Sequence, residues 1–130
     1  MTQSEVKTSS TILYVTAIAN LVYGLLFLLF PQWLFDLSQA PGVPADPGWV
    51  RWGGGLLIGV GVAAWLAAAN PKTQRPLVVG LAVGAALIAL SLLYTLFLGG
   101  YGGVQWFLWL PIVINAALAV GLGWVASKQT

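Results

Sequence analysis

The chain has 130 residues, of which 59% are hydrophobic and only 6% are charged. A soluble domain normally carries about a quarter charged residues, so five Lys or Arg and three Asp or Glu are too few to cover a surface that faces water. Cys and His are absent from the chain, which excludes disulfides, zinc sites, iron–sulfur clusters and His-ligated haem. The composition predicts an integral membrane protein, with no metal or cofactor and, because its few cations are scattered, no nucleic-acid partner.

Four predominantly apolar runs are long enough to cross a bilayer, because about 30 Å of hydrocarbon requires roughly 20 residues of helix. They are Ile12–Phe30, Trp49–Ala69, Leu77–Leu98 and Val104–Ala126. After the first run, Pro31–Leu37 has an amphipathic pattern, which predicts a short helix along the membrane surface. The expected fold is all-α: a single transmembrane domain over residues 1–130, formed by a four-helix bundle with one interfacial segment.

The cations indicate how the helices are oriented. Four spans place both termini and the loop between the second and third spans on one side, which then carries Lys7, Lys72, Arg75 and Lys128. The opposite side carries Arg51, Asp36 and Asp46. By the positive-inside rule both termini are expected to be cytoplasmic, in a bacterial cytoplasmic membrane. The short connections predict that the second and third spans, and the third and fourth, are antiparallel neighbours.

Small residues recur at helical spacing in the second and third spans. In lipid, helices associate where small residues allow their backbones to approach closely. The sequence therefore predicts that the helices pack through Gly55, Gly59, Ala63, Gly80 and Gly84. An alternative is that Gly55 and Gly59 hold two copies of the chain together.

Two asparagines, Asn20 and Asn115, are the strongly polar side chains deep in the spans. A buried carboxamide without a partner is costly, whereas a hydrogen bond between membrane helices contributes roughly 0.6–2 kcal/mol. One interpretation is a structural hydrogen bond between the first and fourth spans, and the other is contact with a ligand. Pro111, four residues before Asn115, is expected to bend the fourth span.

Tryptophans gather at the predicted outer boundary around Arg51. Such belts normally anchor a protein in the interface, and the guanidinium can reach headgroups, stack on an indole or pair with Asp36 or Asp46. The number of indoles near one cation also suggests an outward-facing amphipathic cleft. The candidate ligand-binding residues are Arg51, Asn20, Asn115, Trp49, Trp52, Trp106 and Trp109.

Several functional classes are disfavoured by the sequence. Proton-coupled transport generally requires an ionisable group inside the membrane, and the spans contain no Asp, Glu, Lys or His. An intramembrane hydrolase needs a nucleophile with a base, and Ser91 has no visible base. We therefore expect no enzymatic activity and no catalytic residue.

The order of motifs resembles a known group of small membrane proteins. LLFLLFPQWLF at the end of the first span, a Pro-rich loop and then WVRWGGGLLIGVGVAAWLAAANPKTQR are similar to the bacterial four-helix proteins of the BphX-like and DoxX-like kind. The resemblance covers most of the chain and includes Arg51 and the glycines at 53–55. It implies an accessory role and supplies no catalytic residue.

Two functional hypotheses follow from the sequence. The first is an accessory or structural subunit whose transmembrane faces contact membrane lipids and dock onto a protein partner or a second copy. The second is a binding module or carrier for a lipophilic molecule, such as a lipid, quinone or hydrophobic substrate, held in the Trp and Arg cleft.

Overall fold

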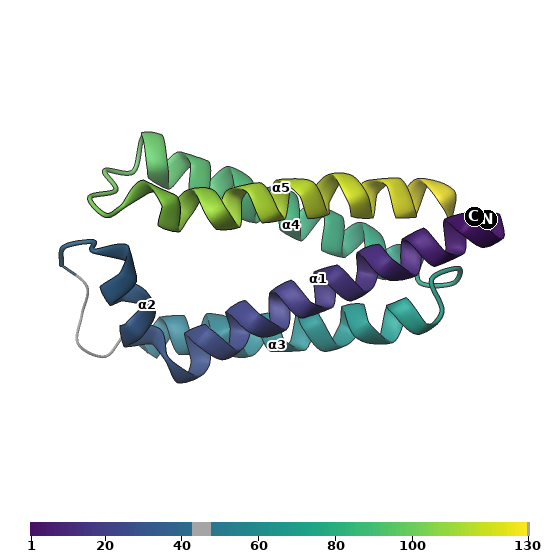
Figure 1. Ribbon diagram of the computed structural model, residues 1–130, viewed down its shortest axis with the longest axis horizontal. Coiled ribbons are helices and arrows are strands. Elements are labelled where there is room, and N and C mark those ends of the chain that lie inside the picture. The colour runs from purple at the N-terminus through teal and green to yellow at the C-terminus, as the bar shows by residue number, and fades with distance from the viewer. Residues whose placement is uncertain (43–47, 130) are drawn as a thin grey trace.

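The structure, a computed structural model, describes residues 1–42 and 48–129 and contains five helices within them. They are α1 (Gln3–Leu29), α2 (Pro31–Ser38), α3 (Gly48–Ala69), α4 (Arg75–Phe97) and α5 (Gln105–Lys128). All except α2 are long and apolar enough to span a membrane. The predicted all-α, four-span architecture is confirmed, and both termini lie at the same end of the molecule (Figure 1). The chain is thus a multi-pass membrane protein.

Helix α1 begins earlier than the apolar pattern indicated, at Gln3 instead of Ile12. A capping box explains the extension: the Glu5 backbone N–H donates to the Thr2 hydroxyl, and the Thr2 N–H donates to the Glu5 carboxylate. These bonds satisfy N–H groups that a helix start otherwise leaves unpaired. Polar residues therefore continue the helix beyond the predicted membrane span.

The predicted interfacial segment forms helix α2. Pro31 at its first turn has no N–H to continue the α1 hydrogen-bonding ladder, which separates the two helices at Phe30. Leu34 and Ser38 are buried, whereas Gln32 and Asp36 are exposed and joined by a 3.1 Å hydrogen bond. The helix ends at Gln39, whose backbone is left-handed with φ 54°. Helix α2 thus turns an apolar face inward and a polar face outward.

The four long helices form two pairs. Helix α1 packs along α3 and helix α4 packs along α5, whereas α3 and α4 touch over a much smaller area. The predicted neighbours α4 and α5 pack along each other, and the predicted neighbours α3 and α4 are also in contact, but α3 packs mainly on α1. The pairs converge at the end that holds the termini and diverge toward α2 (Figure 1).

The α1–α3 contact brings two backbones together. A Cβ atom on Gly54 would lie 2.7 Å from the Leu28 nitrogen and 2.8 Å from the Gly24 carbonyl oxygen. A Cβ atom on Gly24 would lie 2.9 Å from the Gly54 carbonyl oxygen. Further along, a Cβ atom on Gly61 would lie 2.7 Å from the Leu21 side chain. Only glycine permits this approach, which explains why α3 prefers α1 to its nearer neighbour in sequence.

The predicted packing glycines occupy other faces. Cβ atoms on Gly55, Gly59, Gly80 and Gly84 would have no heavy atom within 4 Å, so the prediction that these glycines pack helices of this chain together is wrong. Ala63 is partly buried. Because successive helical residues are rotated by about 100°, Gly54 faces α1 while its neighbour Gly55 faces away. Small residues that recur every four positions lie on one face of a helix, but this spacing does not show which other helix that face contacts.

The two pairs meet in a core that occupies the half of the bundle near the termini. Buried residues from all four long helices form it, including Leu13, Ala64, Val78 and Leu122. Polar contacts close the same end. They are Ser10 Oγ to the Ala68 carbonyl at 2.8 Å, Arg75 Nε to the Ala126 carbonyl at 3.2 Å, Lys128 to Glu5 at 3.2 Å, and Gln129 Nε2 to the Pro71 carbonyl.

The different surroundings of Gly54 and Gly55 predict that alanine at these two positions affects stability differently. We expect Gly54→Ala to lower the free energy of unfolding by about 1–3 kcal/mol, because the added methyl group meets backbone that cannot move without separating α1 from α3. Gly55→Ala should leave that free energy unchanged or slightly raised. Unfolding by SDS in mixed micelles measures both variants, and equal stability of the two would contradict the assigned packing face.

Candidate functional site

The diverging half of the bundle contains a partly open cavity of about 930 Å³. Its volume lies at the upper end of the range of roughly 300–1,000 Å³ that is typical of small-molecule sites. All five helices contribute to its walls, and almost all of the lining is apolar. We refer to this space as the wedge cavity.

Each helix supplies one wall because of its place in the two pairs. Helix α1 contributes residues from Ala19 to Phe27, α3 from Trp49 to Leu57, and α5 from Trp106 to Leu118. Helix α4 contributes Ile88 and Leu92. Helix α2 lies across the open end of the wedge (Figure 1) and contributes its apolar residues Trp33, Leu34, Phe35 and Leu37.

Helix α2 is fixed to the α4–α5 loop. The Val104 backbone N–H donates to the Ser38 carbonyl at 2.7 Å, and the Tyr101 hydroxyl lies 2.9 Å from the Val104 carbonyl and 3.4 Å from that of Ser38. Desolvation raises the pKa of the Tyr101 phenol above its usual value near 10, so the hydroxyl keeps its proton at neutral pH. These contacts join α2, which covers the open end of the cavity and is here called its roof, to the α4–α5 pair.

Aromatic side chains surround the part of the cavity below α2. The rings of Phe35 and Trp49 are 6.3 Å apart between centroids, and those of Trp106 and Phe107 are 6.0 Å apart. Tyr23, Phe27 and Trp33 also line this region. Such rings offer large apolar surfaces with few rotatable bonds, which suits them to contact a hydrophobic or flat molecule.

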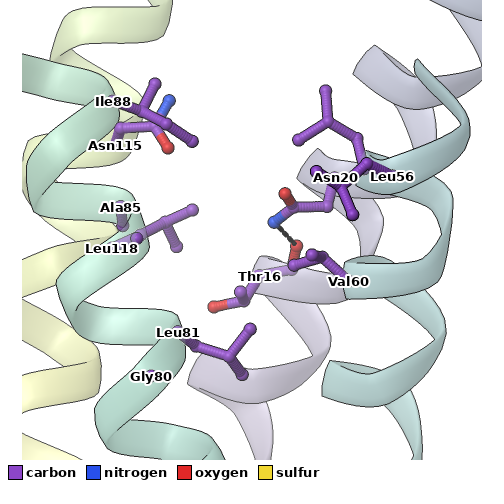
Figure 2. Close-up of a pocket in the computed structure, with 12 residues that line it drawn as sticks. Thr16, Asn20, Leu56, Val60, Gly80, Leu81, Ala85, Ile88, Asn115 and Leu118 are labelled. Carbon is purple, nitrogen blue, oxygen red and sulfur yellow. Dashed lines mark hydrogen bonds between the residues drawn. The ribbon is translucent and has the colours of Figure 1, made fainter. Parts of the chain in front are cut away.

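The deep end of the wedge cavity continues into a smaller pocket of about 250 Å³ that contains both asparagines. Figure 2 shows Asn20 and Asn115 on opposite walls of this pocket. The Asn20 amide donates to the Thr16 carbonyl at 2.8 Å, and the Asn115 amide donates to the Pro111 carbonyl at 2.8 Å. The predicted hydrogen bond between the two spans is therefore not formed. Each carboxamide bonds to its own helix, and the pocket separates the two side chains.

Each asparagine keeps hydrogen-bonding groups that its own helix does not use and that face the pocket. Each carboxamide has two N–H donors and an accepting oxygen, and one N–H is used by its own helix. Among the described residues, no hydrogen bond reaches either carboxamide oxygen. The two asparagines, here called the asparagine pair, thus present acceptors and donors to an otherwise apolar space.

Four of the predicted ligand-binding residues lie together and three do not. Asn20, Asn115, Trp49 and Trp106 line the wedge cavity. Arg51 and Trp52 are exposed on α3, and the ring centroid of Trp109 lies 6.0 Å from that of Phe97. The described residues therefore form a cavity lined by tryptophans, but Arg51 is not part of its lining as the predicted Trp and Arg cleft required. Asp46, a predicted partner of Arg51, lies outside the described residues.

Several lining residues were not predicted from the sequence. Tyr23, Phe27 and Phe107 belong to continuous apolar runs in which every face is hydrophobic, so periodicity does not distinguish the cavity face from the lipid face. The available signal was the amphipathic pattern of Pro31–Leu37. It predicted a surface helix, but not that Trp33 and Phe35 would roof a cavity. Gly80 and Gly84 also line the deep pocket rather than a helix interface.

The wedge cavity is suited to bind an uncharged molecule. Within the described part of the chain its lining contains no Asp, Glu, Lys or Arg. No three described His, Cys, Asp or Glu residues come close enough to hold a metal ion. An ionic group placed in this space would lose its hydration without gaining a counter-charge.

Comparison of the chain with protein-family models, curated proteins and solved structures gives no match to any of them. The resemblance to the BphX-like and DoxX-like proteins stays a prediction. Fold and cavity geometry are therefore the basis for a functional proposal.

The contact between Tyr101 and Ser38 makes the second prediction. We expect Tyr101→Phe to speed hydrogen exchange of the Val104 amide about 2- to 10-fold, because one hydrogen bond that holds the roof is lost. Tyr94→Phe is the control, since the Tyr94 side chain is 63% exposed on the outer face of α4. Hydrogen–deuterium exchange with mass spectrometry measures both, and an unchanged rate in Tyr101→Phe would show that the phenol does not hold α2.

Proposed function

We propose that the protein is a non-catalytic membrane binding module or carrier for a lipophilic small molecule, which occupies the wedge cavity. The observation that carries this proposal is an apolar space of about 930 Å³ walled by every helix of the fold. The cavity is partly open, and its apolar walls offer a surface on which a lipophilic molecule can be buried. A space of this size, retained between helices that pack tightly elsewhere, favours a bound molecule as its content.

The placement of the cavity supports a ligand that resides in the membrane. Four of its five walls are candidate transmembrane helices, and its two carboxamides lie at the deep end instead of at the boundary with water. We further propose that the protein lies in a bacterial cytoplasmic membrane with both termini cytoplasmic. The support is the positive-inside bias of Lys7, Lys72, Arg75 and Lys128.

An accessory subunit is the second candidate function. The observation in its favour is that Gly55 and Gly59 are exposed, with open space around each, four residues apart on one face of α3. Such a face allows close approach of a helix from another chain or from a second copy. On this view the partner would contact α3 on a side that faces away from α1.

The third prediction separates the two functions with two leucine variants on α3. Gly53 lines the wedge cavity with open space beyond its Cβ position, so Gly53→Leu fills part of the cavity without meeting backbone. We expect native mass spectrometry of the gently extracted protein to show a bound small molecule, whose occupancy in Gly53→Leu falls roughly tenfold or more. Gly55→Leu, two residues away on the exposed face, should keep the ligand.

The opposite pattern would support the accessory subunit. In that case the wild-type protein co-purifies with a partner chain or a second copy, Gly55→Leu loses it, and Gly53→Leu retains it. The absence of any bound small molecule from the wild-type protein, after extraction in a detergent that preserves lipids on other membrane proteins, would contradict the binding proposal.

A further inference from the structure

We propose that the ligand of the wedge cavity is an uncharged alcohol or phenol, bound with its hydroxyl group at the asparagine pair and its apolar body below α2. This inference rests on the proposed binding function and names the chemistry of the ligand. It follows from the hydrogen-bonding capacity of the deep end, the lack of charge in the described lining, and the aromatic residues at the other end.

The depth of the asparagine pair sets the direction of binding. Asn20 is nine residues before the end of α1 at Leu29, and Asn115 is ten residues after the start of α5 at Gln105. At 1.5 Å per residue, both lie about 14–15 Å inside the α2 end of the bundle. The polar end of the cavity is therefore near mid-membrane depth, and an amphiphile that satisfies it must enter with its polar group first.

The free groups of the asparagine pair favour a hydroxyl. Each carboxamide retains one N–H and an oxygen, and the two face each other across a pocket whose other lining atoms are mostly apolar. A hydroxyl donates one hydrogen bond and accepts others, so it can bond to both asparagines at once. An alkyl chain satisfies neither side chain, and a carbonyl group leaves both oxygens unsatisfied.

Charge distinguishes this ligand from the bulk lipids of the membrane. A phospholipid that entered headgroup first would bury a phosphate where the described lining offers no cation. A phospholipid that inserted only an acyl chain would leave the asparagine pair unsatisfied. An uncharged alcohol or phenol avoids both costs.

The other end of the cavity fits the apolar body of such a molecule. Seven aromatic residues from α1, α2, α3 and α5 line the cavity: Tyr23, Phe27, Trp33, Phe35, Trp49, Trp106 and Phe107. Three of them are tryptophans, so a quencher carried at the far end of the ligand would lie beside their indoles. This arrangement provides an optical reading of both binding and direction.

The test compares two probes that differ by one hydroxyl. Bromododecanol with its bromine on the carbon farthest from the hydroxyl, and bromododecane, are titrated into the full chain in detergent while tryptophan fluorescence is recorded. We expect a saturable quenching phase for both, with half-saturation for the alcohol at a concentration roughly 3- to 20-fold lower, as expected for one or two membrane hydrogen bonds. Non-saturable quenching of lipid-facing tryptophans such as Trp52 is subtracted.

Variants of the asparagine pair assign the preference. In the double variant Asn20→Leu and Asn115→Leu, half-saturation for the two probes should coincide, while binding of bromododecane is unchanged or stronger. Binding of the alkane thus reports that the variant is folded. Ser91→Ala is the control: its hydroxyl also bonds to its own helix, 2.9 Å from the Ile88 carbonyl, but it faces outward on α4 and should leave the preference intact.

The direction of binding has its own control. The isomer that carries bromine on the second carbon, adjacent to the carbon that bears the hydroxyl, should compete with the first alcohol. It should quench less, because its bromine lies by the asparagine pair and not beside the tryptophans. Equal saturable quenching by the two isomers would overturn the proposed direction.

Two other outcomes bear on the ligand class and on the function. Saturable binding of both probes with no preference for the alcohol, or a preference that survives in the double variant, would overturn the hydroxyl assignment and leave the lipophile-binding proposal intact. No saturable phase with either probe would overturn both.

Discussion

The close contact between α1 and α3 is the constraint on which the rest of the structure depends. At Gly24 and Gly54 the two backbones are so near that neither position can hold a Cβ atom without displacing main-chain atoms of the other helix. In a bilayer, where lipid chains are as apolar as leucine side chains, such proximity is a principal source of helix association. Because α1 packs mainly on α3 and α4 packs mainly on α5, the bundle consists of two helix pairs instead of four equivalent helices.

The wedge cavity follows from the way these two pairs are joined. Near the termini they share a tightly packed core, the ion pair between Lys128 and Glu5, and the hydrogen bond that Gln129 donates to the Pro71 carbonyl. At the other end they are held by α2, which reaches the α4–α5 loop through Ser38, Tyr101 and Val104. The cavity lies between these two attachments. The cavity is thus a consequence of the fold, and not of a single missing side chain.

The chemistry of the cavity differs from that of transporters and enzymes that use buried charge. Its described lining carries two carboxamides and a rim of aromatic rings but no carboxylate, ammonium or guanidinium group. Neutral hydrogen-bonding groups can be held inside a membrane at modest cost because each asparagine places one N–H on a carbonyl of its own helix. The remaining N–H and oxygen of each asparagine can form hydrogen bonds with a neutral polar group.

The sequence by itself determined the class of protein and the positions of its helices. Length and hydropathy define the spans because the thickness of the bilayer and the rise of the helix are fixed quantities, and Pro31 and Asn70-Pro71 mark the interruptions. It also identified Asn20 and Asn115 as unusual, because a strongly polar side chain is costly at that depth. Only the tertiary structure decided that these asparagines do not bond to each other, that Gly54 rather than Gly55 meets another helix, and that α2 roofs a cavity. In helices that are hydrophobic on every face, the pattern of residues does not show which face meets protein and which meets lipid, and that choice depends on how whole backbones fit together.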